Sequence, residues 1–163
     1  MTETLVIRAT GPADLAAVDA LLARSYPKLL KGEYPPSVMV TAVPMISRAR
    51  PGLVCSGTYF LAETVDGSVL GAGGWTRTRG FARRAEIRHV ATDPDHVRRG
   101  VASALFRHIF ATAEEAGVRE YECLATRTAV PFYQAMGFVE VGPTTVPLAP
   151  GIAFPAVRMV RAA

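Results

Sequence analysis

Cysteines, histidines and long apolar runs are scarce in this chain, and each shortage excludes a class of protein. Two cysteines, Cys55 and Cys123, cannot build a disulfide framework and lack metal-ligand spacing, so we expect a reduced cytoplasmic location. The three histidines also lack ligand spacing, which predicts no metal site. No stretch reaches the roughly 20 consecutive apolar residues of a membrane-spanning helix. Glu3 and Arg8 flank a short apolar run without a leading basic segment, so we expect neither a signal peptide nor a membrane partner.

Composition and charge favour one globular domain that binds a small anionic ligand. Half of the 163 residues are hydrophobic and 20% are charged, which excludes a disordered chain. No internal repeat or linker interrupts the sequence, so residues 1–163 are expected to form a single domain. The net charge of +4 is concentrated over 77–88 and at Arg98–Arg99. The basic residues form no helical stripe and have no interleaved aromatics, so a small phosphate-bearing ligand accounts for them better than a nucleic acid.

The hydrophobic pattern predicts strands and helices in the order β-α-α-β-β-β-α-β-α-β-β, an α/β (α+β) fold with a mixed sheet covered by helices. Residues 26–36 are rich in turn formers and predict a loop or a broken helix. Gly71, Gly73 and Gly74 in one strand suggest a bulge or a close backbone approach. Strands are expected over 4–8, 59–65, 69–76, 85–92, 121–125, 138–141 and 156–160, and helices from 12 onward and over 37–48, 100–116 and 128–136.

The most informative stretch is 85–102, AEIRHVATDPDHVRRGVA, in which a strand leads through a tight turn into a helix. The first turn of a helix carries free N–H groups and the positive end of its dipole, and both bind phosphate. Gly100 would let a phosphate approach the backbone. A plain helix start with a helpful glycine is the alternative interpretation. Neither GxGxxG nor a P-loop lysine is present, so Rossmann and Walker chemistry are not supported.

This stretch resembles the acetyl-CoA-binding core of the GNAT acetyltransferase superfamily, whose pattern is Gln/Arg-x-x-Gly-x-Gly/Ala after a strand. Residues 126–138, TRTAVPFYQAMGF, are similar to the closing helix of that family, and GAGGW at 71–75 and PAVRM at 155–159 resemble a common bacterial branch. The resemblance covers nearly the whole chain. It implies a mostly antiparallel central sheet, splayed open at the two strands that hold the cofactor.

The resemblance also implies which residues hold acetyl-CoA, the acyl-donor cosubstrate. Backbone groups of Val90 and Thr92 would pair with the pantetheine arm, in the manner of an added strand. The sequence departs from the family pattern at Val97, where Gln or Arg is usual, and at Thr126, where Asn is frequent. Tyr133 would lie at the thioester, and the pyrophosphate would be bound by the backbone from Arg98 to Ser103, namely Arg98, Arg99, Gly100, Val101, Ala102 and Ser103.

The chemistry implied by the family is direct acyl transfer to an amine, with a base to deprotonate the amine. Glu86 aligns with the strand glutamate that is the base in some members, although a surface carboxylate paired with Arg84 and Arg88 is the alternative. His89 is the second candidate base, and strand alternation predicts that it points to the opposite face. Tyr133 aligns with the general acid that protonates the departing thiolate, although an aromatic there could serve only as core.

Together these features predict an N-acetyltransferase that acts on a small-molecule amine or a protein amino group. A non-catalytic acyl-CoA-binding sensor of the same fold is the alternative. The acceptor would be held by residues 26–36, where Lys28, Lys31 and Tyr34 would favour an anionic or aromatic compound, and by 142–154. Trp75 is expected in the core or in the acceptor pocket. Homodimers are common among proteins of this kind, and the resemblance leaves a homodimer open.

Overall fold

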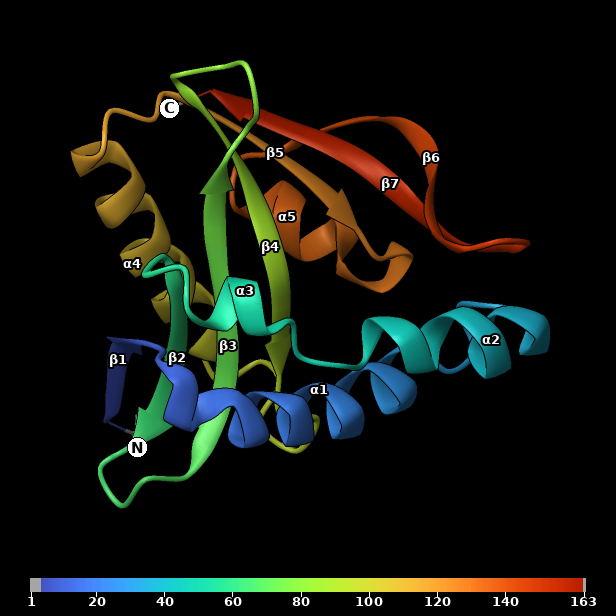
Figure 1. Cartoon of the computed structure of the whole chain (residues 1–163), viewed down its shortest axis with the longest axis horizontal. Coiled ribbons are helices and arrows are strands. Elements are labelled where there is room, and N and C mark those ends of the chain that lie inside the picture. The colour runs from blue at the N-terminus through green and yellow to red at the C-terminus, as the bar shows by residue number, and fades with distance from the viewer. Residues whose placement is uncertain (1–3, 163) are drawn as a thin grey trace.

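In the computed structural model, which describes residues 4–162, seven strands form one sheet in the order β1-β2-β3-β4-β5-β7-β6 (Figure 1). The strands are β1 (Leu5–Ala9), β2 (Tyr59–Thr64), β3 (Val69–Arg77), β4 (Arg84–Thr92), β5 (Glu120–Ala125), β6 (Val139–Ala149) and β7 (Ile152–Ala162). The helices are η1 (Pro12–Asp14), α1 (Leu15–Leu30), α2 (Pro36–Ile46), α3 (Pro51–Val54), α4 (Val101–Glu115), η2 (Arg127–Ala129) and α5 (Val130–Ala135). No helix in this part of the chain is long and apolar enough to cross a membrane.

The sheet is splayed between β4 and β5. Their pairing is parallel and ends after Glu86 and Glu122, whereas the other neighbouring strands described here pair antiparallel. Beyond this point the two strands diverge, as Figure 1 shows. The mixed, mostly antiparallel sheet and its opening at β4 and β5 confirm the predicted fold.

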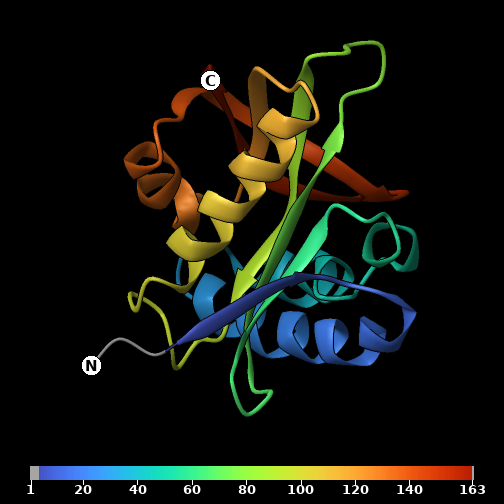
Figure 2. The ribbon, with the colours of Figure 1, turned by 90° about the vertical axis from the view of Figure 1, so that its left-hand side faces the viewer.

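Helices cover both faces of the sheet and create two cores. On one face α4 and α5 pack over the strands, and on the other lie α1 and α2 (Figures 1 and 2). Strand alternation separates the residues of β2 between the two cores, with Phe60 and Ala62 in the first and Tyr59 and Leu61 in the second. The largest fully buried side chains include Tyr59, Tyr121, Phe106, Leu21, Leu22 and Leu30.

A bulge reverses this alternation in β4. His89 has a φ of +50°, and the pairing with β3 shifts between Ala72 and Gly74. Ala85 and Ile87 therefore face the first core, but Ala91 faces the second. Gly74 permits the tight packing behind the bulge, because a Cβ there would lie 2.6 Å from Cα of Tyr59. The glycines of β3 predict a bulge or a close backbone approach; the close approach is confirmed at Gly74, and the extra residue of the bulge lies on the paired strand β4.

Two hydroxyl groups stabilise the bulge from the α1 side of the sheet. Tyr26 Oη donates a hydrogen bond to the Val90 carbonyl and Tyr59 Oη donates one to the His89 carbonyl, each over 2.8 Å. Both tyrosines are buried. These bonds satisfy carbonyl groups that the displaced strand would otherwise leave without partners.

Three elements differ in extent from the sequence prediction. A loop or a broken helix is predicted over 26–36, but α1 continues without a break through Pro27 to Leu30, so the prediction is wrong for the first five residues. Burial of Tyr26 and Leu30 against the sheet offsets the cost of a proline inside a helix, which is about 3 kcal/mol. Strands β6 and β7 also run far beyond the predicted 138–141 and 156–160. Strand β6 tolerates Pro143 and Pro147 because it is an edge strand of the sheet.

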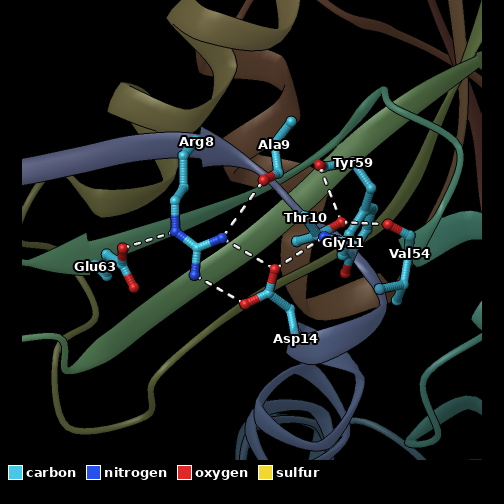
Figure 3. Close-up of polar contacts among 8 residues, drawn as sticks. All are labelled: Arg8, Ala9, Thr10, Gly11, Asp14, Val54, Tyr59 and Glu63. Atoms are coloured by element: carbon cyan, nitrogen blue, oxygen red, sulfur yellow. Dashed lines mark hydrogen bonds and ion pairs between the residues drawn. The ribbon is translucent and has the colours of Figure 1, made fainter.

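The first strand is fastened by a polar cluster around Arg8 (Figure 3). Its guanidinium donates to Glu63 of β2 over 2.8 Å and to both carboxylate oxygens of Asp14 over 2.8 and 2.9 Å. Asp14 also accepts the N–H of Gly11 over 2.8 Å. The Arg8 hydrogen bond lowers the pKa of Asp14. The cluster thus holds β1 to β2 and sets the chain direction into α1.

Candidate active site

A cavity of about 440 Å³ lies beside the open end of β4, between α1, α5 and the start of α4. Eight of the nine residues predicted to hold the cofactor line it, and Arg99 does not. The eight are Val90, Thr92, Arg98, Gly100, Val101, Ala102, Ser103 and Tyr133. Residues from three separate parts of the chain therefore meet at one cavity, as the resemblance implied.

One end of this cavity has the properties of an anion site. Gly100 caps α4 with a φ of +80°, and Arg98 before it has a φ of +63°. In the first backbone hydrogen bond of α4, the Ala104 N–H donates to the Gly100 carbonyl over 3.0 Å. The amides of Val101 to Ser103 therefore have no acceptor within residues 4–162, and they form the positive end of the helix dipole. Arg98 lines the cavity, and none of its lining residues is a carboxylate.

The edge of β4 runs along the same cavity. Past Glu86 this edge has no partner in β5, and Val90 and Thr92 lie on it. The Val90 carbonyl already accepts the hydrogen bond from Tyr26, so one of the backbone groups predicted for the pantetheine arm has a partner within the fold.

A second cavity, of about 230 Å³, lies between β4, β5, the end of α2 and the hairpin of β6 and β7. Glu86 lines it, together with Arg50, Arg88 and His89. Five residues line both cavities, so the two spaces adjoin; they are Tyr26, Val90, Thr126, Ala129 and Tyr133. The predicted base and the predicted acid thus line the same cavity, and the acid stands where the two cavities meet.

Tyr133 projects from α5, and its ring packs on aromatic neighbours. It is 6% exposed, with ring centroids 5.6 Å from Phe106, 5.7 Å from Phe132 and 5.2 Å from Phe138. Its hydroxyl has no hydrogen-bond partner among the described residues, while its side chain lines both cavities. Burial raises the pKa of Tyr133 well above its ordinary value, so the hydroxyl stays protonated and can donate.

Glu86 is half-buried and belongs to no ion pair within residues 4–162. Arg84 pairs instead with Glu120 over 3.0 Å, and Arg88 Nη1 donates to Thr76 Oγ1 over 3.1 Å. The interpretation of Glu86 as a surface carboxylate paired with these two arginines is therefore wrong. Its carboxylate is available to a molecule in the second cavity.

His89 corrects one sequence expectation. The bulge turns it to the same side as Glu86 rather than to the opposite face, because the extra residue shifts strand alternation by one. Nε2 lies 2.7 Å from the Ile46 carbonyl, which can only accept, so Nε2 carries the proton. Burial lowers the pKa of His89, and the charges of Arg50 and Arg88 lower it further. The imidazole is thus neutral and joins α2 to β4.

The remaining sequence candidates lie away from the two cavities. Trp75 is buried and its Nε1 donates to Thr112 Oγ1 over 3.0 Å, which confirms the core interpretation. Cys123 is buried, and burial raises the pKa of its thiol to about 12. Lys28, which was expected to favour an anionic acceptor, pairs with Asp95 over 3.2 Å. Lys28, Lys31 and Tyr34 line neither cavity, so the preference for an anionic or aromatic acceptor that was predicted from them finds no support in the lining of the cavities.

Sequence reasoning missed two residues of the site. The turn formers of 26–36 predict a loop or a broken helix at Tyr26, yet Tyr26 lines both cavities. Arg50 lies in the connection from α2 to α3, and no local pattern marks it. Arg50 comes near His89 only when the end of α2 reaches β4, where the Ile46 carbonyl accepts the hydrogen bond of His89.

Comparison with known proteins agrees with this geometry. The family model described as "Acetyltransferase (GNAT) domain" matches residues 55–140, which is more than half of the chain and contains Glu86, Gly100 and Tyr133. A search of curated proteins found no match.

Solved structures with the same fold span the whole chain. A GCN5-related N-acetyltransferase from Rhodopseudomonas palustris has a TM-score of 0.78 at 20% identity, covering 100% of this chain and 97% of that one. PaiA N-acetyltransferase from Thermoplasma acidophilum, solved with coenzyme A, has a TM-score of 0.76 at 15% identity, with coverages of 98% and 99%. N-acetylglutamate synthase from Neisseria gonorrhoeae, complexed with coenzyme A and L-arginine, has a TM-score of 0.66 at 18% identity, with coverages of 99% and 34%. At such identities the likeness establishes the fold, and the family model establishes the membership: the chain belongs to the GNAT acetyltransferase family.

Proposed function

We propose that this protein is an N-acetyltransferase that moves an acetyl group directly from acetyl-CoA to an amine. The observation that carries the proposal is the junction of the two cavities at Tyr133, with free helix amides in one cavity and Glu86 in the other. A transferase for two substrates needs two binding spaces that meet at the reacting atoms. The solved relatives that contain coenzyme A support this choice of donor.

The residues of the larger cavity fit coenzyme A. The amides of Val101 to Ser103 and the Arg98 side chain suit a diphosphate, and no carboxylate lines the cavity to repel it. Val97 stands where the family usually has Gln or Arg, so binding would rely on the amides. Acetyl-CoA, when bound, supplies the acetyl thioester.

In the proposed reaction, Glu86 accepts a proton from the acceptor ammonium, directly or through a water molecule. The free amine nitrogen attacks the thioester carbonyl, a C–N bond forms, and the C–S bond breaks. The Tyr133 hydroxyl donates a hydrogen bond and then a proton to the departing thiolate. The surplus proton of the attacking nitrogen passes through solvent and restores the Tyr133 hydroxyl. Glu86 is preferred as the base because it aligns with the strand glutamate of the family and forms no ion pair among the described residues. Nδ1 of His89, which is the basic nitrogen because Nε2 donates to Ile46, is the second candidate. Cys123 stays a thiol at neutral pH, which favours direct transfer over a covalent intermediate.

Ligand-induced stabilisation tests the donor site. Acetyl-CoA at 100 times its Kd adds about 2.7 kcal/mol, which raises the Tm of a chain of this size by about 5–10 °C. Gly100→Glu should abolish this rise, because it places a carboxylate beside the phosphate-binding amides. Gly80→Glu is the matched control, since Gly80 has a φ of +84° against +80° for Gly100, and both have open space at Cβ. An equal rise in both variants would place the donor elsewhere.

Turnover is measured by release of free coenzyme A from acetyl-CoA across a panel of amines. Release that depends on the amine supports the transferase. Binding of acetyl-CoA without release for any amine would contradict it and would favour an acyl-CoA-binding sensor.

A further inference from the structure

The charged residues of the second cavity suggest what kind of amine it accepts. Glu86, Arg50 and Arg88 are its charged lining residues, beside the neutral His89. Most of the other walls are apolar, and these include Ile46, Leu124, Val146, Leu148 and Phe154. The second cavity therefore presents one negative and two positive side chains between apolar walls.

The two arginines are not neutralised by the fold. Neither Arg50 nor Arg88 forms an ion pair within residues 4–162, although Arg88 donates one hydrogen bond to Thr76. Both charges act on His89, whose pKa they lower in addition to the effect of burial. Each guanidinium has N–H groups left to donate, and a planar guanidinium binds a carboxylate through two parallel hydrogen bonds.

Hydrogen bonds hold the elements that carry these arginines. The Asp19 carboxylate accepts the N–H of Ala49 over 2.8 Å, next to Arg50. The Ile46 carbonyl accepts the His89 bond at the end of α2. Arg88 lies on β4, two residues from Glu86 and on the same side of the strand. The connection that carries Arg50 is thus tied both to α1 and to the strand that carries the predicted base.

The size of the cavity limits the acceptor. Its volume of about 230 Å³ is below the 300–1,000 Å³ that is typical of pockets for drug-sized ligands. A molecule with the dimensions of an amino acid suits this space.

We propose that the acceptor is a small amino acid-like compound, with a carboxylate bound by Arg50 and Arg88, its amine at Glu86 and an apolar side chain. This inference rests on the proposed function and narrows it from amines in general to zwitterionic amines. The opposite charges of the cavity match the two charges of such a compound, and its apolar walls match the side chain. The products would be the N-acetyl amino acid and coenzyme A.

Matched substrates test the inference. L-phenylalanine and L-leucine are compared with L-phenylalaninamide and L-leucinamide, which keep the amine and the side chain but lack the negative charge. We expect kcat/KM to be at least about 10-fold higher for the acids, the range for a hydrogen bond to a charged group. Equal or higher values for the amides would overturn the inference.

Variants assign the preference to the two arginines. Arg88→Gln and Arg50→Gln should each lower the acid-to-amide ratio of kcat/KM by about 10- to 100-fold, and Arg88→Lys should lower it less. Arg48→Gln removes the same charge from an exposed residue that lines neither cavity, so it should leave the ratio unchanged. Arg50 is exposed, so its variant tests the inference even if Arg88→Gln fails to fold.

The preference for zwitterionic amines and the acetyltransferase activity are tested separately. If uncharged amines such as phenethylamine are acetylated and neither arginine variant changes the ratio, the inference is wrong while the transferase stands. If no amine releases coenzyme A, both are wrong. Acetylation of peptide N-termini in preference to free amino acids would also overturn the inference.

Discussion

Tyr133→Phe removes one oxygen atom from the junction of the two cavities. The ring contacts with Phe106, Phe132 and Phe138 are kept, because Phe has the same ring. The lost hydroxyl has no hydrogen-bond partner among residues 4–162, so no buried group is left unsatisfied. The free energy of unfolding should therefore change by no more than about 0.5 kcal/mol, the range for neutral substitutions.

Activity should fall much further than stability. General acid catalysis contributes roughly 10²–10⁴-fold, and a thiolate is a tolerable leaving group even without an acid. We expect turnover to fall by roughly 10- to 10³-fold while acetyl-CoA still raises the Tm. The raised pKa of Tyr133 also predicts that the wild-type rate shows no loss from tyrosine ionisation up to at least pH 10.

Coenzyme A release and thermal unfolding are measured on the same preparation. Tyr121→Phe is the matched control, because Tyr121 is 1% exposed, its hydroxyl also lacks a partner, and it lines neither cavity. It should retain both stability and activity. Wild-type turnover in Tyr133→Phe would show that Tyr133 only packs the core, and a similar loss in Tyr121→Phe would show that the effect is not local to the junction.

Two further predictions concern charge. Glu86→Gln should lower turnover by roughly 10²-fold at neutral pH, with partial recovery at high pH as free amine accumulates, and acetyl-CoA should bind as before; unchanged turnover would remove Glu86 as the base. Stability should fall in two stages on acidification. Burial lowers the pKa of His89, so its contribution is complete above the ordinary value of 6.5 and is lost as pH falls below it. The pKa of Asp14 is lowered by Arg8, so its contribution is lost only below about 3.8. The urea midpoint of unfolding, measured from pH 8 to pH 3, checks both stages. His89→Asn should remove the loss of stability between pH 7 and 5. A wild-type midpoint that stays constant over this range would contradict the role of His89.

The sequence by itself determined the local units of this protein. The strand, turn and helix over 85–102 are encoded by an apolar strand, Asp93–Pro94 and Gly100, all of which act on their immediate neighbours. Neighbouring residues also encode the closing helix over 126–138 and the hairpin turn at Asp66–Gly67. Because these units also carry the family pattern, Glu86, Gly100 and Tyr133 could be named as candidate site residues from the sequence.

The tertiary structure decided how these units face one another. Local propensity ends a helix near Pro27, but burial of Tyr26 and Leu30 against the sheet carries α1 onward. Strand alternation places His89 opposite Glu86, but two tyrosine hydroxyls from other elements hold the bulge that brings them to one side. Arg50 lies near His89 only because the end of α2 reaches β4 through the bond between Ile46 and His89. In each case the deciding partner is distant in the sequence, so no periodicity or turn signal near the residue could reveal it.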